Sequence, residues 1–330
     1  MKNNILIHFW IPEEVSNKAN KEFNLIYPRR KANDLMTIDQ VTEILPTVEG
    51  ILVSGLALGR AFDKMLIDMG SRLKVIGTLG VGYENIDYKY AGKKDICVVN
   101  TPIAVQQPTA ELTVAIMLAV ARCVVNLDKK IRTEKKRVPL PIFDKGATTL
   151  YGKILGIIGF GRIGKAVGIK CNSLGMKIIY SDPVPADEEF EKSINAIHTS
   201  MEELLKTADF VTIHCPYFPE NHHLLNQKTI KMMKSSSYLI NASRGKMIDE
   251  QALVDALKGG TIAGAALDVY EYEPEVHQEL LKLDNVVLVP HIGTWSYNAR
   301  VAMALEALEG MCKFIKGEMP INCVNKEYLK

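Results

Sequence analysis

The glycines between Gly159 and Gly164 have the spacing Gly-x-Gly-x-x-Gly, and an unbroken apolar run, residues 154–158, directly precedes them. Residues 165–174 then continue with the apolar spacing of a helix. This pattern predicts a buried parallel strand, a glycine turn and the start of a helix. We expect Gly159 to make the tight turn, Gly161 to let a pyrophosphate approach the backbone, and Gly164 to pack helix on strand. The motif therefore predicts dinucleotide binding.

Two further features of this region indicate how the dinucleotide is bound and which dinucleotide it is. The N–H groups of Arg162 and Ile163 are expected to point at the phosphates, with the helix dipole behind them. A second apolar strand, residues 177–180, ends at Asp182, about 20 residues after the third glycine. A carboxylate at this place accepts hydrogen bonds from a ribose 2′-OH and repels a 2′-phosphate. We therefore expect NAD as the cofactor rather than NADP.

Reactive side chains follow three later predicted strands. Arg244 follows residues 238–241, Asp268 and Glu273 follow residues 262–267, and His291 follows residues 286–289. Each of these side chains could have a purely structural role. In a doubly wound sheet, however, ligands bind beyond the carboxyl ends of the strands. A guanidinium, carboxylates and an imidazole are therefore expected to converge near the nicotinamide.

Short apolar runs alternate with helical stretches along most of the chain, which predicts two parallel sheets flanked by helices. In the N-terminal part we predict strands at residues 5–10, 24–27, 50–54, 74–78 and 96–100, and helices near 38–45, 60–69 and 88–93. From residue 152 onward we predict strands at residues 154–158, 177–180, 210–214, 238–241, 262–267 and 286–289. One apolar helix is expected from Thr109 to about Lys130, followed by an irregular connection over residues 132–149.

A last helix at residues 297–316 is expected to return the chain to the first domain. We therefore predict an α/β protein with two doubly wound parallel-sheet domains and a cleft between them. Residues 1–101 and 298–330 form one domain, and residues 102–297 form the other. His222 and His223 are adjacent, so we expect their side chains to diverge as loop histidines, and no metal-ligand spacing is evident.

The composition restricts the class of protein. The chain has 330 residues, of which 24% are charged and 47% hydrophobic, with a net charge of +2. These values favour an ordinary soluble protein and provide no case for nucleic-acid or membrane attraction. Six cysteines are scattered without a C-x-x-C pair, which favours reduced cysteines in a cytoplasmic protein. Residues 5–11 follow a short N-terminal stretch but lack a small-residue cleavage site, so a first strand is expected there rather than a signal peptide.

Taken in order, the motifs resemble those of the D-isomer-specific 2-hydroxyacid dehydrogenases, and most resemble the glyoxylate/hydroxypyruvate reductase-like branch. The matching stretches are residues 82–87, 100–102, 109–111, 159–164, 214–216, 239–245, 262–269, 273–274 and 290–293. The resemblance implies a Rossmann domain that binds NAD and a smaller flavodoxin-like domain that binds the substrate. It also implies a homodimer that pairs through the region of the apolar helix at 109–130.

The resemblance further implies a role for each matched residue. Arg244 is similar to the arginine that grips the substrate carboxylate and polarises the reacting carbonyl. His291 is similar to the general acid, and Glu273 to the carboxylate that orients the imidazole and favours its protonated form. Backbone N–H groups of Val81 and Gly82 are implied to receive the substrate carboxylate. The further implied cofactor contacts are Thr109, Cys215, Pro216, Ala242 and Asp268, with Asp268 holding the nicotinamide carboxamide.

Departures from three related patterns favour a small unphosphorylated 2-keto acid, such as glyoxylate, hydroxypyruvate or pyruvate. Phosphoglycerate enzymes place arginines where this chain has Ser54 and Thr78. Formate enzymes have a glutamine at the position of Glu273, and phosphite enzymes have a lysine at the position of Val81. A nicotinamide-sensing corepressor is an alternative from another class, although those proteins carry extended tails. Trp295, which follows His291, could shape the pocket or serve packing.

Overall fold

A computed structural model describes residues 2–29, 34–55, 58–142 and 146–330. The chain forms two compact units. One unit comprises Met1–Val105 and Thr294–Lys330, and the other comprises Gln106–Gly293. Both units are parallel-sheet α/β structures.

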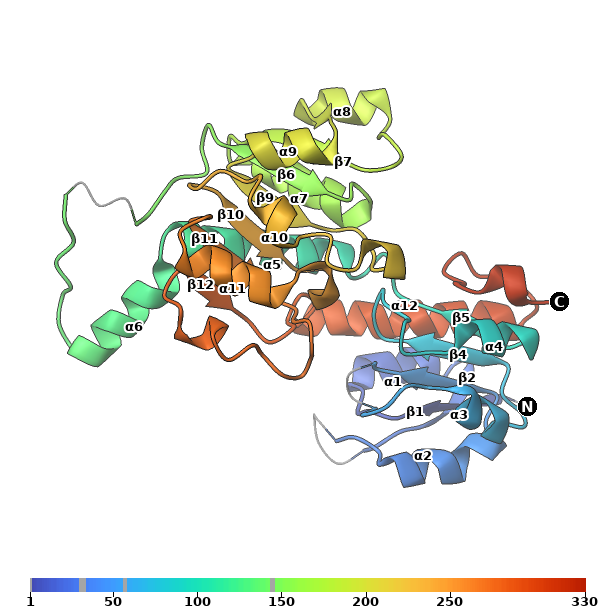
Figure 1. Cartoon of the computed structure of the whole chain (residues 1–330). Helices are drawn as coiled ribbons and strands as arrows, with labels where there is room; N and C mark the ends of the chain where they lie inside the picture. Colours follow the sequence, from blue (N-terminus) through green and yellow to red (C-terminus); the bar gives the residue numbers. More distant parts are fainter. Residues whose placement is uncertain (1, 30–33, 56–57, 143–145) are drawn as a thin grey trace. The chain divides into compact units, whose positions relative to one another are not determined.

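The Gln106–Gly293 unit is built on a seven-stranded sheet with the strand order β12-β11-β10-β9-β6-β7-β8, and every pairing is parallel (Figure 1). This order, with the sequence reversing direction between β6 and β9, is that of a Rossmann fold. Its strands are β6 (Ile154–Ile158), β7 (Lys177–Ser181), β8 (Ile197–His198), β9 (Phe210–Ile213), β10 (Tyr238–Asn241), β11 (Gly264–Leu267) and β12 (Val286–Leu288). The central strands are apolar because helices cover both of their faces.

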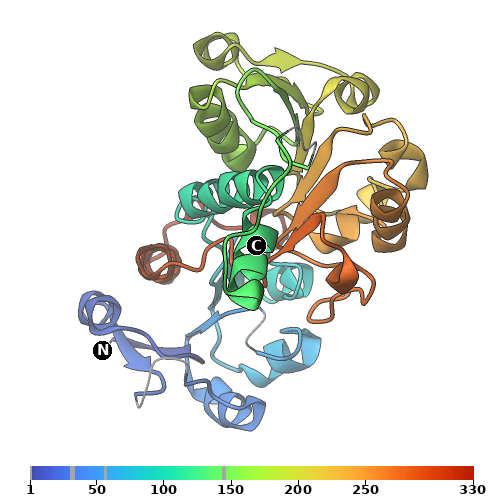
Figure 2. The same ribbon diagram turned by 90° about the vertical axis from the view of Figure 1, so that its left-hand side faces the viewer.

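Helices lie on both faces of this sheet, as Figure 2 shows. One face is covered by α5 (Gln106–Ala121) and α7 (Arg162–Ser173), with α8 (Glu188–Ile194) beside α7. The other face is covered by α9 (Met201–Thr207), α10 (Gln227–Ile230) and α11 (Glu250–Lys258). A separate hydrophobic cluster fills each side, so the carboxyl ends of the strands are left for loops.

The other unit has a five-stranded parallel sheet in the order β2-β1-β3-β4-β5, which is the flavodoxin-like order. Its strands are β1 (Asn3–Ile7), β2 (Phe23–Ile26), β3 (Gly50–Val53), β4 (Val75–Thr78) and β5 (Cys97–Val99). One face packs on α1 (Glu13–Ala19) and α12 (Tyr297–Ile315), and the other on α2 (Ile38–Ile44), α3 (Lys64–Met69) and α4 (Tyr88–Lys93). The last long helix therefore returns to the first sheet, as expected.

The prediction of one helix from Thr109 to about Lys130 is wrong. The chain leaves α5 at Ala121, Cys123 adopts a left-handed conformation with a φ of 53°, and α6 (Val124–Glu134) begins with its axis turned by 59°. The apolar composition concealed this break, because a left-handed non-glycine residue has no sequence signature. Of the predicted irregular connection, residues 132–134 belong to α6, and residues 143–145 lie outside the described residues.

Helix α1 and strand β8 are not among the predicted elements. Strand β8 has only two residues, both exposed, and no apolar pattern. Within the described ranges, no single helix is long and apolar enough to cross a membrane. The bent pair formed by α5 and α6 meets that criterion together, by length and composition only.

Candidate active site

The glycine turn between β6 and α7 has the geometry that its sequence predicts. Gly159 has a φ of +87°, and a Cβ at this position would lie 2.4 Å from the backbone nitrogen of Cys215. A Cβ on Gly164 would lie 2.2 Å from the carbonyl oxygen of Gly159. Both positions therefore require glycine for the fold itself, because a side chain would collide with rigid backbone.

Gly161 differs from these two glycines. Its φ is −73°, and a Cβ added here would meet nothing within 4 Å. The fold itself does not require glycine at this position. The absence of a side chain on Gly161 instead keeps the space above the turn open. Gly161 is also the N-cap of α7, and no side chain caps the N–H groups of the first turn, which begins at Arg162 and Ile163. An open cradle at a helix N-terminus fits the pyrophosphate of a dinucleotide.

Asp182 lies at the end of β7 and is tied to the glycine turn. Its Oδ2 accepts a hydrogen bond from the backbone N–H of Phe160 at 2.7 Å, and its Oδ1 accepts one from Val184 at 3.0 Å. The backbone N–H of Gly159 also donates to the carbonyl of Ser181 at 2.9 Å. These hydrogen bonds therefore fix the position of the carboxylate expected to bind the ribose relative to the turn expected to bind the phosphates.

Cys215, Pro216 and Ala242 follow the carboxyl ends of β9 and β10. The hydroxyl of Ser243 donates a 2.6 Å hydrogen bond to the carbonyl of Cys215, which links the two loops. The buried Asn241 fixes the second loop, since its Oδ1 accepts from the N–H of Ser243 and its Nδ2 donates to the carbonyl of Arg244. Sequence reasoning did not single out Asn241, although a buried amide at a strand end could have indicated it.

Arg244 lies between β10 and a short 3₁₀ helix, Gly245–Met247, and it is half-buried. Its Nη1 donates to the carbonyl of Ser243 at 2.8 Å. A Cβ on Gly245 would lie 1.9 Å from the backbone of Tyr270, so this turn packs directly on the loop that carries Glu273. The guanidinium and Glu273 are therefore held on two loops in contact.

Glu273 and His291 are hydrogen-bonded in the structure, with Oε2 2.9 Å from Nδ1. Oε1 of Glu273 accepts the backbone N–H of Tyr270 at 3.0 Å. Burial acts to raise the pKa of Glu273, but the hydrogen bond and charge of His291 and the charge of Arg244 outweigh it, so the pKa is lowered. The pair uses Nδ1 of the imidazole, which leaves Nε2 as the nitrogen that can exchange a proton with a ligand. The side chain of His291 is 35% exposed and therefore accessible.

Asp268 fixes the backbone of the histidine loop. Its two carboxylate oxygens accept the N–H groups of Ile292 at 2.6 Å and Gly293 at 2.9 Å. A Cβ on Gly293 would lie 3.2 Å from Asp268 and 3.5 Å from the hydroxyl of Thr109, so these three residues pack together. Burial raises the pKa of Asp268 to about 6. The family resemblance implies a cofactor contact at Asp268. In the structure, this carboxylate also shapes the turn after His291.

Val81 and Gly82 lie in the other unit, after β4. The side chain of Asn100 donates to the carbonyl of Val81 at 2.9 Å, and the backbone N–H of Thr101 donates to the carbonyl of Gly80 at 2.9 Å. Asn100 and Thr101 are both buried and follow β5. The loop expected to receive a carboxylate is therefore anchored to the neighbouring strand end.

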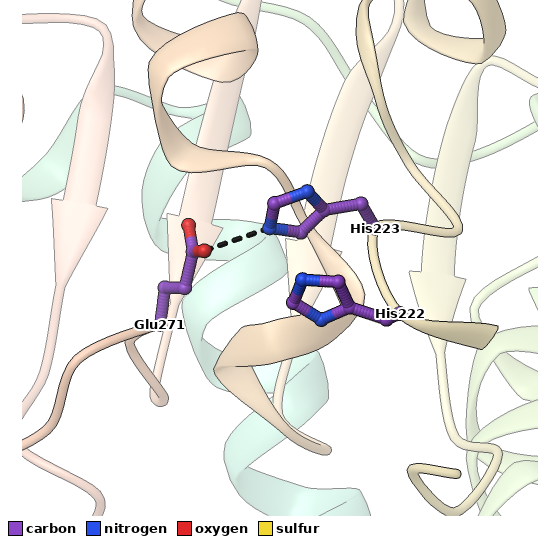
Figure 3. Close-up of side chains that lie close together, drawn as sticks. All are labelled: His222, His223 and Glu271. Carbon is purple, nitrogen blue, oxygen red and sulfur yellow. Dashed lines mark hydrogen bonds and ion pairs between the residues drawn. The ribbon is translucent and has the colours of Figure 1, made fainter. Parts of the chain in front are cut away.

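The expectation that His222 and His223 diverge is wrong. Their imidazole rings stack with centroids 3.8 Å apart and planes inclined by 24°. His223 has a φ of 52°, and this left-handed conformation turns two adjacent side chains to the same side. Figure 3 shows both rings beside Glu271.

Comparison with known proteins identifies the family of this chain. The sequence model of the family described as D-isomer specific 2-hydroxyacid dehydrogenase, NAD binding domain, matches residues 114–293. A Staphylococcus aureus protein named as a 2-hydroxyacid dehydrogenase is 46% identical over 263 residues, which cover 80% of this chain and 82% of that protein. The chain belongs to the D-isomer-specific 2-hydroxyacid dehydrogenase family. It is therefore an oxidoreductase that acts on a CH–OH group with a nicotinamide cofactor.

Solved structures resemble the whole chain. A glyoxylate reductase from Paecilomyes thermophila superposes with a TM-score of 0.85 at 29% identity, covering 99% of both chains. A D-lactate dehydrogenase from Aquifex aeolicus, solved with NAD and lactic acid, superposes with a TM-score of 0.81 at 29% identity and covers 98% of this chain and 99% of its own. The two-unit fold of this dehydrogenase is therefore that of its family.

Proposed function

We propose that this dehydrogenase reduces a small unphosphorylated 2-keto acid to the D-2-hydroxy acid with NADH, and that the reaction is reversible. The observation that carries the proposal is the 2.9 Å pair between His291 and Glu273, with the Arg244 charge acting on the same carboxylate. Reduction of a keto acid requires two groups: a cation that binds its carboxylate, and an acid that gives a proton to its carbonyl oxygen. Arg244 can serve as the first, and the imidazole of His291 as the second.

Each of the three residues has a distinct part in this proposal. Arg244 binds the substrate carboxylate and polarises the carbonyl, because a planar, permanently charged fork can donate two parallel hydrogen bonds. His291 gives a proton from Nε2 to the carbonyl oxygen, and takes it back in the oxidative direction. Glu273 accepts from Nδ1, fixes the ring and stabilises the imidazolium. A bound nicotinamide supplies or accepts the hydride.

We propose NAD as the preferred cofactor. Gly159, Gly161 and Gly164 with the N–H groups of Arg162 and Ile163 would hold its pyrophosphate, and Asp182 would accept from the ribose hydroxyl. A 2′-phosphate would meet the negative charge of Asp182. We place the remaining contacts at Thr109, Cys215, Pro216, Ala242 and Asp268.

The substrate class follows from what surrounds the carboxylate-binding loop. Thr78 at the end of β4 is buried, and Ser54 follows β3, so neither position offers a cation to a phosphate. The glyoxylate reductase and the lactate dehydrogenase that resemble this chain are named for small acids. Glyoxylate, hydroxypyruvate and pyruvate are therefore the first substrates to test.

We assign substrate binding to the unit that contains Val81 and Gly82, and cofactor binding to the Gln106–Gly293 unit. We also propose a homodimer that pairs through α5 and α6. Three apolar side chains of α6, Val124, Val125 and Ile131, are about half exposed (54%, 48% and 52%), which suits an interface helix better than an isolated one. Sedimentation that finds a monomer at micromolar concentration would contradict the dimer.

The function is tested with a panel of 2-keto acids and both reduced cofactors, following the loss of reduced-cofactor absorbance. We expect turnover of a small keto acid with NADH, and less or none with NADPH, phosphohydroxypyruvate or phosphite. Binding of NADH without turnover of any member would favour the corepressor-type sensor instead.

A further inference from the structure

A second cluster of ligating side chains lies in the Gln106–Gly293 unit, separate from the His291–Glu273 pair. It consists of His222, His223 and Glu271, and we refer to it as the two-histidine cluster. Nε2 of His223 lies 2.7 Å from Oε1 of Glu271, and one ligand atom from each of the three residues lies within 4.8 Å of the others. In Figure 3 the two imidazoles lie next to each other, and Glu271 approaches them from another loop.

Backbone hydrogen bonds fix the loop that carries the two histidines. The backbone N–H of His223 donates to the carbonyl of Lys246 at 3.0 Å, and that of Leu225 donates to Met247 at 3.0 Å. This loop therefore runs beside the segment that follows Arg244. The stacked arrangement of the two rings is thus set by backbone hydrogen bonds as well as by the side chains.

The carboxylate side of the cluster contains two buried glutamates, Glu271 and Glu250. Glu271 and Glu250 are both buried, at 7% and 2% exposure, and each accepts the backbone N–H of the other. Within the described residues, Oε2 of Glu250 is buried and has no hydrogen-bond partner. The buried carboxylate of Glu271 therefore meets two imidazoles at a place where a cation would be stabilised.

We propose that His222, His223 and Glu271 bind one divalent cation of the zinc class. Two imidazole nitrogens and one carboxylate oxygen suit Zn²⁺, Co²⁺ or Ni²⁺, whereas Mg²⁺ and Ca²⁺ prefer oxygen ligands alone. Three protein ligands leave a fourth position for water.

Binding requires only small movements of these side chains. Ligand atoms around a tetrahedral zinc ion lie about 3.3 Å apart when each bond is about 2 Å long. The 2.7 Å contact between His223 and Glu271 must therefore widen slightly, and the exposed His222 must move inward. His223 would bind through Nε2 and keep its proton on Nδ1, so that the cation replaces the hydrogen bond to Glu271.

This cluster is distinct from the proposed active site, yet it shares two structural segments with it. The loop from Tyr270 to Glu273 presents Glu271 to the histidines and Glu273 to His291. Gly245, next to Arg244, packs on the same loop. The cation site would therefore share a loop with Glu273 and lie next to the turn that carries Arg244.

The test uses untagged full-length protein, freed of metal with a chelator and dialysed. Co²⁺ is titrated while its visible absorption is followed, and Zn²⁺ affinity is measured by calorimetry. We expect one ion per chain, and a loss of affinity of about tenfold or more for His222→Ala and for Glu271→Gln. The double variant His222→Ala/His223→Ala should lose the site. Zn²⁺ should raise the thermal unfolding midpoint of the wild type but not that of the double variant.

Two control variants separate this site from others. His277→Ala removes a histidine outside the cluster, and His291→Asn removes the imidazole of the proposed active site; both should bind Co²⁺ as the wild type does. Circular dichroism of each variant establishes that it is folded. The proposal is overturned if the wild type binds no Co²⁺, if the double variant binds it unchanged, or if His291→Asn abolishes binding.

Discussion

Nδ1 of His291 and Oε2 of Glu273 lie 2.9 Å apart, although the two residues belong to loops that follow different strands, β12 and β11. The strands are parallel neighbours, so both loops leave the same edge of the sheet. His291 has a φ of 54°, and its loop is held by two backbone hydrogen bonds to Asp268. The pair is therefore positioned by the backbone and not only by mutual attraction.

Removing the imidazole should remove proton transfer but not cofactor binding. We expect His291→Asn to lower the rate of keto-acid reduction by roughly 10²–10⁴, the usual contribution of a general acid. NADH binding, followed by quenching of protein fluorescence, should stay near the wild-type value, because the glycine turn is unchanged. Near-wild-type turnover by this variant would show that the proton comes from another group.

Removing only the carboxylate charge should change the pH dependence. In the structure, the pKa of Glu273 is lowered despite burial, chiefly by its hydrogen bond to His291, so the carboxylate is ionised at neutral pH. An ionised carboxylate stabilises the imidazolium, which is the form that donates the proton. In Glu273→Gln this stabilisation is lost, so reduction should decline at a lower pH than in the wild type. Rate profiles of both proteins across pH measure this, and an unchanged profile would argue against the pairing.

The glycine turn offers a matched pair of substitutions. Gly159→Ala places a Cβ 2.4 Å from backbone at a φ of +87°, so we expect loss of stability or failure to fold. Gly161→Ala places a Cβ in open space at a φ of −73°, so the thermal midpoint should hardly change. NADH affinity should nevertheless fall, because the methyl group fills the space above the turn. If Gly161→Ala binds NADH as tightly as the wild type, the turn does not hold the pyrophosphate.

The preference between cofactors should depend on Asp182. Because Oδ2 and Oδ1 accept the N–H groups of Phe160 and Val184, the carboxylate is already oriented. In Asp182→Ala we expect a higher KM for NADH and weaker discrimination against NADPH, since the negative charge is gone. Steady-state kinetics with both cofactors provide the comparison. A wild type that prefers NADPH would contradict the assignment directly.

Two histidines with lowered pKa values should make the fold sensitive to acid. Burial lowers the pKa of His8 to about 4 and that of His214 to about 3. Between these values and pH 6.5, the two imidazoles stay neutral in the folded chain but become protonated in the unfolded chain. Stability should therefore fall as the pH drops from 6.5 towards these values. His8 alone accounts for about 2 kcal/mol of the free energy of unfolding between pH 7 and pH 5.

The variant His8→Gln checks this acid sensitivity. Nε2 of His8 accepts the backbone N–H of Ser54 at 3.0 Å, and the oxygen of a glutamine could accept the same bond without titrating. Urea unfolding at pH 7 and pH 5 should therefore show a smaller difference for the variant than for the wild type. An equal difference would mean that His8 is not protonated on unfolding.

Local signals in the sequence were sufficient to predict much of the fold. The apolar run before Gly159 and the glycine spacing after it determine β6, the turn and α7, because neighbouring residues make all the contacts involved. Alternation of apolar runs and helices predicted both parallel sheets. It also placed Arg244, Glu273 and His291 on one sheet edge, since parallel strands end on the same side.

The tertiary structure decided which of these side chains meet. His223, His291 and Cys123 are non-glycine residues with positive φ. The first stacks two histidines, the second turns the loop that carries the His291 side chain, and the third ends α5. Such conformations are imposed by contacts between segments far apart in the chain, as when Lys246 holds His223 and Asp268 holds Gly293. The sequence by itself determined the strands, the glycine turn and the residues at the strand ends. The pairing of Glu273 with His291, and of Glu271 with His223 across 48 residues, depends on loop backbones that only the packed structure defines.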